Sequence, residues 1–305
     1  MASERRAVVA FVVGEFPKPS ETFLLRELRA LAERGLDFVI VATRKLPEIP
    51  EAAGLMERVV LRPPLISTAT AGAKLRFVAT HPFRYLDAVV ALFRGHWRSL
   101  RELVQAQTNL PRAMAVAYGL RRRGVTRIHA LWANFPATLG WMMARGLRVP
   151  FSFSGHAWDV FVGGRMLKEK MRLATHAVAC SAATAQRLKE IGGKSGARKV
   201  VLIHHGIEHD AAPEREAATE PLILAAGRFE EKKGFDVLVE ACKVLADRGY
   251  GFACRIVGDG PMKGRLAAAI KEHRSRQAGA GGTYSTVSSV WIATSTRAGV
   301  KWATR

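Results

Sequence analysis

The first fifty residues show an ordered succession of apolar and polar positions. Residues 7–13 form an unbroken apolar run that ends at Gly14, and after a polar loop apolar side chains recur at helical spacing over residues 24–31. That pattern stops at Gly35, and a second apolar run covers residues 38–42. Unbroken apolar runs are typical of strands buried on both faces of a sheet, so this segment predicts a β-α-β unit of a parallel sheet.

A second segment repeats the same order far along the chain. Residues 222–226 are apolar and end at Gly227, a polar loop reaches Gly234, helical periodicity covers residues 237–245, and an apolar run follows at residues 252–257. The sequence therefore predicts a second β-α-β unit with a parallel sheet of its own.

Alternating elements fill the stretch between these two segments. Short apolar runs predict strands at residues 128–133, 151–154, 177–180 and 200–203, and periodic segments predict helices at residues 137–147, 166–174 and 182–191. Residues 206–220 are charged and alanine-rich without a period, which is typical of a linker. The sequence thus predicts an α/β protein with a first domain over residues 1–205 and a second domain that begins at residue 221.

The end of the chain has a different composition. Residues 273–305 contain no acidic residue, Ser and Thr fill ten of these 33 positions, and a short strand-like run near residues 287–293 is the one sign of a period. We expect an irregular basic tail there. Residues 221–272 supply two parallel strands and two helices, too few to cover both faces of a doubly wound sheet. The second domain is therefore expected to be incomplete, through a truncated or misjoined gene end or with a disordered extension in its place.

Composition narrows the class of protein. With 49% hydrophobic and 24% charged residues, the chain of 305 residues is typical of globular proteins. Three cysteines without a C-x-x-C spacing indicate a reducing compartment and no structural zinc site, and the histidines lack the H-E-x-x-H spacing. No run reaches the roughly 18 apolar residues of a membrane span, and residues 7–13 are interpreted as a buried strand rather than a signal peptide. We expect a cytoplasmic protein without a metal cofactor.

Charge points to an anionic partner. The chain carries 47 Lys and Arg against 26 Asp and Glu, a formal net charge of +21. Its partner can be a nucleic acid, a lipid headgroup or a phosphorylated ligand. Residues 62–127 concentrate the excess, because they hold twelve basic residues and two acidic ones. No helix-turn-helix, RNP or zinc-finger pattern accompanies this charge, so a nucleic acid is the weakest of these candidates.

The loop after residues 222–226 carries the most informative polar side chains. Arg228 directly follows Gly227, Lys233 comes five positions after Arg228, and Gly234 precedes the helix. Two cations and a helix N-terminus at the carboxyl edge of a parallel sheet can bind a diphosphate without a metal ion. The competing interpretation is that Arg228 and Lys233 are solvated loop charges.

Glycines mark two further turns at the carboxyl edges of the predicted sheets. Gly258 and Gly260 lie in a Gly-Asp-Gly-Pro turn after residues 252–257 and are expected near the same ligand, although the turn alone is a weak signal. Gly14 permits close approach of the backbone after the first strand. No G-x-G-x-x-G occurs there, and no acidic residue ends the strand at residues 38–43, which argues against a nicotinamide dehydrogenase.

Two polar groups in the first domain complete the candidate site. His156 and Asp159 are three positions apart and share a face if a helix follows Gly155, with His156 near its N-terminus and able to donate to an anionic or hydroxyl-bearing ligand. A histidine beside an aromatic residue is also a common packing residue. The side chains of residues 20–22 (Ser20, Glu21 and Thr22) are candidates for hydrogen bonds to an acceptor hydroxyl in an interdomain cleft. Alternatively, Ser20 or Glu21 is the N-cap of the first helix.

Several motifs together resemble retaining glycosyltransferases of family four, which have the GT-B fold of two Rossmann-like domains. The resemblance spans roughly residues 7–272, and its opening is similar to exopolysaccharide enzymes such as colanic-acid-type transferases. It rests on Gly14 with Phe16-Pro17 and Ser-Glu-Thr-Phe (20–23), His-Ala-Leu-Trp (129–132), Ser-Gly-His-Ala-Trp-Asp (154–159), Ala-Cys-Ser (179–181), His-Gly-Ile-Glu (205–208), Gly227-Arg228, Lys233-Gly234 and Ile-Val-Gly-Asp-Gly-Pro (256–261).

The resemblance implies transfer of a sugar from a nucleotide-diphosphate donor to a hydroxyl of a lipid-linked glycan. It implies that Arg228 and Lys233 grip the donor diphosphate, that His156 contacts the donor sugar, and that the loop at Gly14 approaches both substrates, in a metal-independent mechanism. The family's Glu-x₇-Glu pair has no match after Glu272. We therefore expect an incomplete second GT-B domain and a chain that is itself inactive; a noncatalytic acceptor-binding scaffold and a basic nucleic-acid-binding protein remain the alternatives.

The resemblance also favours one partner for residues 62–127. Aromatic and basic residues interleave there, as expected of an amphipathic surface that lies on an anionic membrane leaflet near a lipid-linked acceptor. We therefore expect a peripheral protein on the inner face of the plasma membrane, with a solvated basic face as the alternative. The aromatic residues of this surface are Phe77, Phe83, Tyr85, Phe93 and Trp97.

Overall fold

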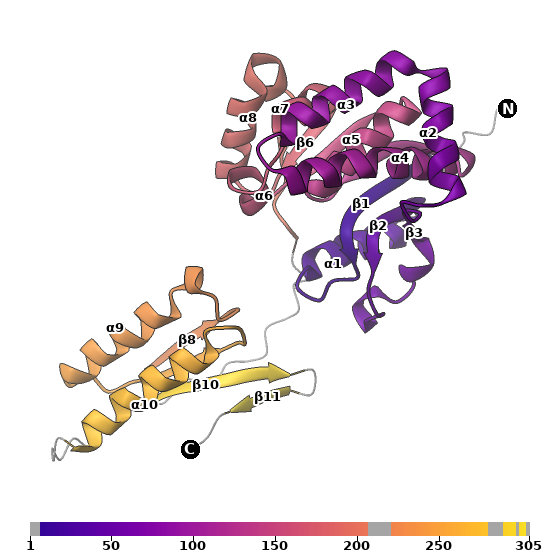
Figure 1. Ribbon diagram of the computed structural model, residues 1–305. Coiled ribbons are helices and arrows are strands. Elements are labelled where there is room, and N and C mark those ends of the chain that lie inside the picture. The colour runs from indigo at the N-terminus through magenta and orange to yellow at the C-terminus, as the bar shows by residue number, and fades with distance from the viewer. Residues whose placement is uncertain (1–6, 207–220, 280–288, 297–298, 303–305) are drawn as a thin grey trace. The chain divides into compact units, whose positions relative to one another are not determined.

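The chain forms two compact units, residues 1–209 and residues 210–305 (Figure 1). A computed structural model describes residues 7–206, 221–279, 289–296 and 299–302. The linker expected over residues 206–220 lies outside the described residues, apart from Gly206. Each unit is therefore considered by itself.

The first unit is built on a seven-stranded parallel sheet with the strand order β3-β2-β1-β4-β5-β6-β7. Because all seven strands are parallel, each of the six connections between consecutive strands crosses over a face of the sheet, as in a Rossmann-like domain. The strands are β1 Val8–Phe16, β2 Phe38–Lys45, β3 Val59–Leu61, β4 Val125–Ala130, β5 Phe151–Gly155, β6 His176–Ala179 and β7 Val200–Leu202.

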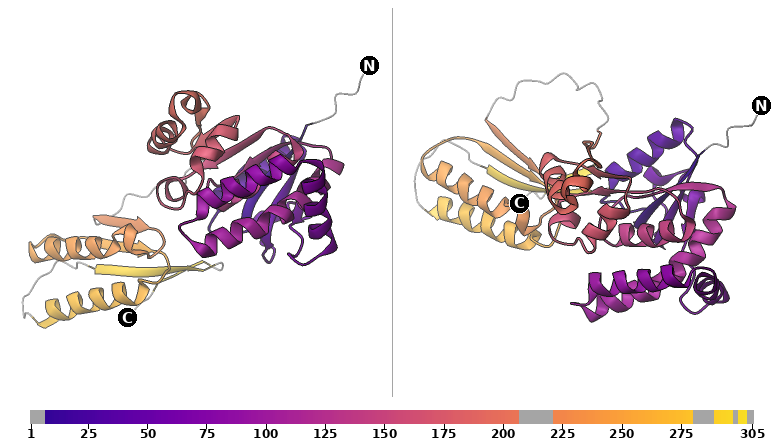
Figure 2. Two further views of the ribbon diagram at one scale, coloured as in Figure 1. Left: turned by 45° about the horizontal axis from the view of Figure 1, so that its top comes forward. Right: turned by 90° about the horizontal axis from the view of Figure 1, so that it is seen from above.

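Helices cover the two faces of this sheet unequally. The helix α1 lies on the opposite face from α3 and α4 (Figure 2). Because successive side chains of a strand point to opposite faces, Phe11 and Val13 pack beneath α1 while Ala10 and Val12 join the larger core on the other side. The helices are α1 Thr22–Glu33, α2 Thr68–Thr80, α3 Pro82–His96, α4 Leu100–Arg122, α5 Phe135–Leu147, α6 Ala157–Phe161, α7 Leu167–Leu173 and α8 Ala182–Ala197.

The second unit contains the other predicted β-α-β unit. The strands β8 Leu222–Ala226 and β9 Ala253–Val257 are parallel neighbours, and α9 Phe235–Asp247 connects them. The helix α10 Lys263–Gly279 lies beside α9 on one face of the sheet (Figure 2). This unit has a core of its own around Phe229.

The end of the chain differs from the expected irregular tail. Residues 273–279 continue α10, β10 Ser289–Thr296 pairs in parallel with β9, and β11 Gly299–Trp302 pairs antiparallel with β10. The run Val-Trp-Ile at residues 290–292 explains the strand, since β-branched and aromatic residues favour extended backbone. The sheet of the second unit thus contains one more parallel strand, β10, than residues 221–272 provide, with the antiparallel strand β11 beside it.

Candidate functional site

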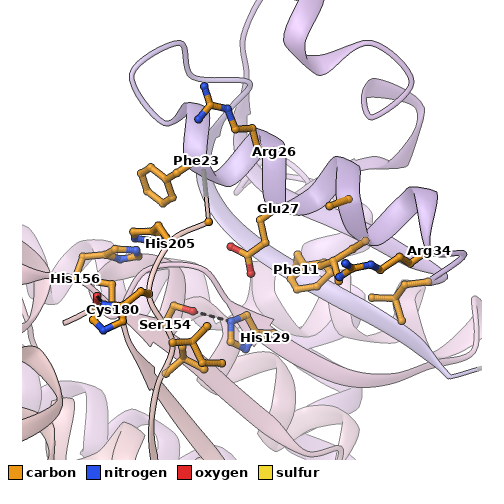
Figure 3. A pocket seen from close by; sticks show the side chains of 17 residues that line it. Phe11, Phe23, Arg26, Glu27, Arg34, His129, Ser154, His156, Cys180 and His205 are labelled. Atoms are coloured by element: carbon orange, nitrogen blue, oxygen red, sulfur yellow. Dashed lines mark hydrogen bonds between the residues drawn. The ribbon is translucent and has the colours of Figure 1, made fainter. Parts of the chain in front are cut away.

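A pocket of about 670 Å³ opens in the first unit beside α1 (Figure 3). Phe23 and Glu27 on α1 form one wall, and residues at or just after the carboxyl ends of β4, β5, β6 and β7 form the other. Ligand sites of open α/β sheets lie at this edge, because loops from several parallel strands meet there. The wall from the strands includes His129, Ser154, His156, Cys180 and His205.

His156 lies in the aromatic part of this pocket, as the sequence predicted for a site residue. It is the N-cap residue of α6, and its ring stacks on that of His205 with the centroids 5.1 Å apart and the planes 6° from parallel. The Trp132 ring lies 4.2 Å away on a tilted plane. The Nδ1 atom of His156 is buried without a hydrogen-bond partner among the described residues. That nitrogen lies 3.8 Å from the buried Asp159 carboxylate.

Asp159 has a different position from the acceptor-side role that the sequence suggested. Its side chain is fully buried, and its carboxylate accepts hydrogen bonds from the backbone N–H of His156 at 2.6 Å and of Ala133 at 2.5 Å. The three-residue spacing turns the carboxylate back onto the start of α6 instead of out into the pocket. Asp159 thus fixes the backbone that carries His156, and it does not reach a ligand.

Lys170 is a buried cation that the sequence analysis missed. Its Nζ atom donates hydrogen bonds to the carbonyls of Ala133, Asn134 and Arg165 at 2.7, 2.8 and 2.7 Å. Burial lowers the pKa of Lys170 to about 7, and the Asp159 charge partly opposes this shift. Asp159 thus accepts from the backbone N–H of Ala133, and Lys170 donates to the backbone carbonyl of the same residue. These two hydrogen bonds fix the backbone at Ala133 and so hold the neighbouring Trp132 against His156.

The acceptor-side residues at the start of α1 lie close to this cluster but do not line the pocket. Glu21 accepts a hydrogen bond from Trp132 Nε1 at 3.3 Å and pairs with Lys18 at 3.2 Å. Ser20 and Thr22 are exposed. Glu21 occupies the N-cap position without a capping bond from its side chain. The face of α1 that meets the pocket begins one residue later and repeats at helical spacing, through Phe23, Arg26, Glu27, Ala30, Leu31 and Arg34.

Two titratable side chains in the pocket are shifted by burial. The Glu27 carboxylate points from α1 into the pocket (Figure 3), where desolvation raises its pKa and the His156 charge opposes the rise. Burial lowers the pKa of His129 to about 4. The ring nitrogens of His129 lie 2.7 and 3.0 Å from the hydroxyls of Ser152 and Ser154, so a neutral imidazole is held among neutral partners. Neither Glu27 nor this role of His129 was predicted from the sequence.

Gly14 lies near the carboxyl end of β1. A methyl group built on it meets no atom within 4 Å, and its carbonyl accepts a hydrogen bond from Thr43 Oγ1 at 2.5 Å. Packing within the described residues therefore does not require glycine at this position. The prediction that Gly14 allows close approach of a ligand stays a prediction.

Arg228 and Lys233 lie in the loop between β8 and α9 of the second unit. Arg228 pairs with Glu230 at 3.0 Å, and Lys232 binds the other oxygen of Glu230 at 3.1 Å. The hydrogen bond from Lys232 and the Arg228 charge lower the pKa of Glu230. Lys233 is exposed at the end of the single 3₁₀ turn Glu231–Lys233 before α9. Glu230 was not recognised from the sequence, and an anionic ligand at Arg228 would have to compete with it.

Packing within the second unit explains why residues 258 and 260 are glycines. A methyl group on Gly258 would lie 1.9 Å from the carbonyl oxygen of Gly227, and Gly260 adopts φ +153° with its own methyl position 2.7 Å from the Phe229 carbonyl oxygen. The loops after β8 and β9 therefore approach each other too closely for a side chain. Their predicted contact with a donor remains untested, but packing alone accounts for both glycines.

A row of exposed apolar side chains follows the outer face of α3. We call this row the α3 apolar stripe; its residues are spaced three or four positions apart, so that they share one face of the helix. Their exposed fractions range from 37% to 85%, whereas Ala88 and Leu92 on the other face are buried against the core. Exposed arginines flank the stripe at 94, 98 and 101. The stripe comprises Phe83, Leu86, Val90, Phe93 and Trp97.

This arrangement corrects part of the amphipathic surface expected over residues 62–127. Phe77 is only 2% exposed and packs in the core, and Tyr85 is partly buried. The other three aromatic residues of the predicted surface, Phe83, Phe93 and Trp97, belong to the α3 apolar stripe. None of the helices within the described residues has the length and apolar content that crossing a bilayer requires.

The fold and this site define a glycosyltransferase of the GT-B class. Residues 20–211 match the profile described as Glycosyltransferase Family 4, and residues 207–278 match Glycosyl transferases group 1. The first match covers more than half of the chain, so the chain belongs to Glycosyltransferase Family 4. The matches together extend over most of both units.

Relatives and solved structures agree with this assignment. The chain is 25% identical over 292 residues to the putative colanic acid biosynthesis glycosyltransferase WcaL of Escherichia coli (strain K12), covering 87% of this chain and 68% of that protein. The lipopolysaccharide outer core galactosyltransferase WaaB has a TM-score of 0.57 at 12% identity, over 95% of this chain and 69% of WaaB. Anabaena HepE, solved with UDP-glucose, has a TM-score of 0.51 at 13% identity, over 93% and 68%. At these identities the structural likeness concerns the fold, which is the predicted GT-B fold.

Proposed function

We propose that the protein transfers a sugar from a nucleotide-diphosphate donor to a hydroxyl of a glycan during exopolysaccharide synthesis. The observation that carries this proposal is the match of both units to glycosyltransferase profiles. WcaL, the relative that aligns along most of the chain, is named for colanic acid synthesis, which supports a polysaccharide as the product.

The proposed chemistry is a metal-independent transfer with retention of configuration. The bond between the anomeric carbon and the diphosphate breaks, and its electron pair leaves with the diphosphate. The acceptor oxygen attacks the same face of the oxocarbenium-like sugar, and its proton passes to the departing phosphate oxygen. Arg228 and Lys233 would stabilise the charge that develops on the diphosphate. His156, which lines the pocket, would donate a hydrogen bond to the sugar.

Glu230 supplies a counter-charge to the loop between β8 and α9, which would bind the donor diphosphate. Arg228 and Lys232 both pair with its carboxylate, so the loop is charge-compensated before a ligand binds. The exposed ion pair between Arg228 and Glu230 contributes little free energy. A diphosphate carries more negative charge than one carboxylate, so it would compete successfully with Glu230 for Arg228. Donor binding should therefore depend on Arg228 without a large penalty for breaking the resting pair.

Release of nucleoside diphosphate from a panel of nucleotide sugars tests the proposal. If the chain is active despite its incomplete second domain, one nucleotide sugar should be turned over in the presence of an exopolysaccharide repeat-unit acceptor. Arg228→Ala should then lower the rate by about two orders of magnitude, because one positioned hydrogen-bonding cation in such a site contributes on the order of 3 kcal/mol. Lys243→Ala, a change of a half-buried cation on α9 that pairs with Glu240, is the control and should retain the rate. Equal rates in both variants would refute the role of Arg228.

The same panel tests the expectation that this chain is inactive. Acceptor binding without release of diphosphate from any donor would support inactivity or the alternative of a noncatalytic scaffold. Clear donor-dependent transfer would refute both, and would show that turnover does not need the Glu-x₇-Glu pair that has no match after Glu272.

A membrane-bound acceptor is the finer part of this proposal. The α3 apolar stripe and the exposed arginines beside it support a peripheral position on an anionic bilayer, where a lipid-linked glycan would be within reach. Apolar residues enter the boundary between headgroups and acyl chains, and arginines pair with the phosphates. This contact would place the first unit on the membrane.

A further inference from the structure

Three side chains from distant parts of the first unit come together at the inner end of the pocket. His156 follows β5, Cys180 follows β6 and His205 lies beyond β7, and one nitrogen or sulfur atom from each lies within 4.8 Å of the others. Figure 3 shows the three side chains grouped beside the pocket, apart from Glu27 and His129. Their separation along the chain hides this group from any search for short metal-binding spacings.

The chemistry of this donor set fits a thiophilic divalent cation. Two imidazoles and one thiolate form a Cys-His₂ set, which leaves the fourth tetrahedral position open. Bonds of about 2.0–2.3 Å to such an ion place its ligand atoms roughly 3.5 Å apart. The three atoms therefore need to close by about 1 Å from their largest separation, and His205, which is exposed, can make that movement.

Neighbouring groups already orient two of the three ligands. His204 Nδ1 lies 3.0 Å from the Cys180 carbonyl oxygen, and the Ile203 N–H donates to the Ala179 carbonyl at 2.9 Å, so the segment that carries His205 is tied to the end of β6. The Asp159 carboxylate lies 3.8 Å from Nδ1 of His156. A carboxylate behind a histidine ligand is a common support of zinc sites.

We propose that the first unit binds one zinc-like divalent cation between His156, Cys180 and His205. The ion displaces the thiol proton of Cys180, which passes to solvent, and binds His156 through Nε2, because Nδ1 of that ring faces the Asp159 carboxylate. It needs no role in sugar transfer: because it engages His156 and fills the inner end of the pocket, it would inhibit that reaction. Only this inhibition rests on the proposed function, since binding of the ion is independent of it.

Cobalt(II) is the probe for this site, because a cobalt–thiolate bond absorbs in the near ultraviolet and tetrahedral cobalt absorbs in the visible. Titration of the full chain under reducing conditions should give both bands and saturate at one ion per chain. Zinc added afterwards should abolish them. Cys180→Ser should remove the near-ultraviolet band, and His205→Gln, a change at an exposed position, should weaken cobalt binding at least tenfold.

Cys242→Ala is the control, since Cys242 lies in the core of the second unit beside another buried cysteine, Cys254. This variant should keep the cobalt spectrum unchanged. The proposal is overturned if the wild type gives no thiolate band, if the band survives Cys180→Ser, or if Cys242→Ala removes it. If circular dichroism shows that Cys180→Ser does not fold, the His205→Gln variant decides the question. An unchanged cobalt affinity in that variant overturns the metal-binding proposal. A metal site in a chain that, once freed of metal, shows no transfer activity would leave the binding proposal intact and count against the proposed function.

Discussion

At the residue scale, the position of His156 depends on two buried opposite charges. Asp159 accepts from the N–H of Ala133, and Lys170 donates to the carbonyl of the same residue. The two side chains hold the short loop that carries Trp132 against the imidazole ring. Neither charge needs to touch a substrate in order to matter for the site.

Asp159→Asn should therefore destabilise the first unit by about 3 kcal/mol, because an amide N–H would face one of the two backbone donors and Lys170 would lose its counter-charge. The free energy of unfolding from urea titration measures this effect. Asp87→Asn breaks an exposed pair with Arg145 and should cost less than about 1 kcal/mol. Similar small losses in both variants would contradict the proposed support of the loop.

His129 should make the protein sensitive to acid. Its pKa is lowered to about 4 in the folded chain by burial, while the unfolded chain has the ordinary value of 6.5. Between these values the unfolded state binds a proton that the folded state does not, so stability falls as the pH drops from 6.5 to 4, by about 1.4 kcal/mol per pH unit at most.

The comparison that isolates this effect is the wild type against His129→Gln, which keeps hydrogen-bonding groups near Ser152 and Ser154 but cannot titrate. The difference between their free energies of unfolding should shrink as the pH falls through this window. A difference that stays constant with pH would show that His129 does not contribute.

At the element scale, the α3 apolar stripe should determine binding to lipid. Phe83 and Phe93 are 85% and 54% exposed, so replacing both by serine should leave the thermal stability nearly unchanged. Each lost side chain removes about 2 kcal/mol of apolar burial from a membrane-bound state, and the double variant should bind vesicles at least tenfold more weakly. Co-sedimentation with vesicles that contain anionic lipid measures this loss.

Val237→Ser is the matched control, since Val237 is 69% exposed on α9 of the second unit. It should bind vesicles as the wild type does. If the wild type does not sediment with any vesicles, or if the double serine variant binds equally well, the membrane contact of α3 is wrong.

Gly258 provides a test of the contact between the two loops at the edge of the second sheet. Gly258→Ala should destabilise this unit by about 1–3 kcal/mol, because the added methyl group collides with the Gly227 backbone. Gly264→Ala is the control: its methyl group would meet no atom within 4 Å, and alanine in helix α10 should stabilise by about 0.5–1 kcal/mol. Opposite changes in the free energy of unfolding are expected, and equal changes would contradict the contact.

The elements that the sequence predicted are those with a simple period. Buried parallel strands appear as unbroken apolar runs, and β1, β2, β8 and β9 were found in this way. The helices α2 to α4 were missed, since α3 carries apolar residues on both its buried and its exposed faces and arginines lie among them. A period is lost when both faces of a helix are apolar.

Site residues were predictable where a local motif carries them. The motif around His156 singled out a residue that lines the pocket, its role there stays a prediction, and the family resemblance was right. Cys180, His205 and Glu27 reach the pocket from separate elements, and their meeting depends on the order of strands in the sheet, which periodicity does not give. The role of Asp159 was misjudged because spacing cannot show whether a carboxylate caps its own backbone or points away from it.

At the scale of the whole molecule, the formal charge of +21 determines how the protein meets any anionic surface. Charge alone attracts nucleic acids and anionic vesicles alike, and salt screens that attraction beyond about 10 Å at 0.1 M. Apolar contacts do not weaken with salt in this way. At high ionic strength, binding to a bilayer should therefore retain its apolar part, whereas binding to a nucleic acid should be lost.

Binding to anionic vesicles should weaken when NaCl is raised from 50 to 500 mM and then level off above zero, because the α3 apolar stripe continues to hold the bilayer. Binding to a random-sequence duplex should fall steeply, with a linear dependence of the logarithm of affinity on the logarithm of salt concentration and no plateau. The Phe83→Ser and Phe93→Ser double variant should lose the vesicle plateau and keep the duplex behaviour. Vesicle binding without a plateau, or a plateau that persists in the double variant, would contradict apolar contact of the α3 apolar stripe with lipid.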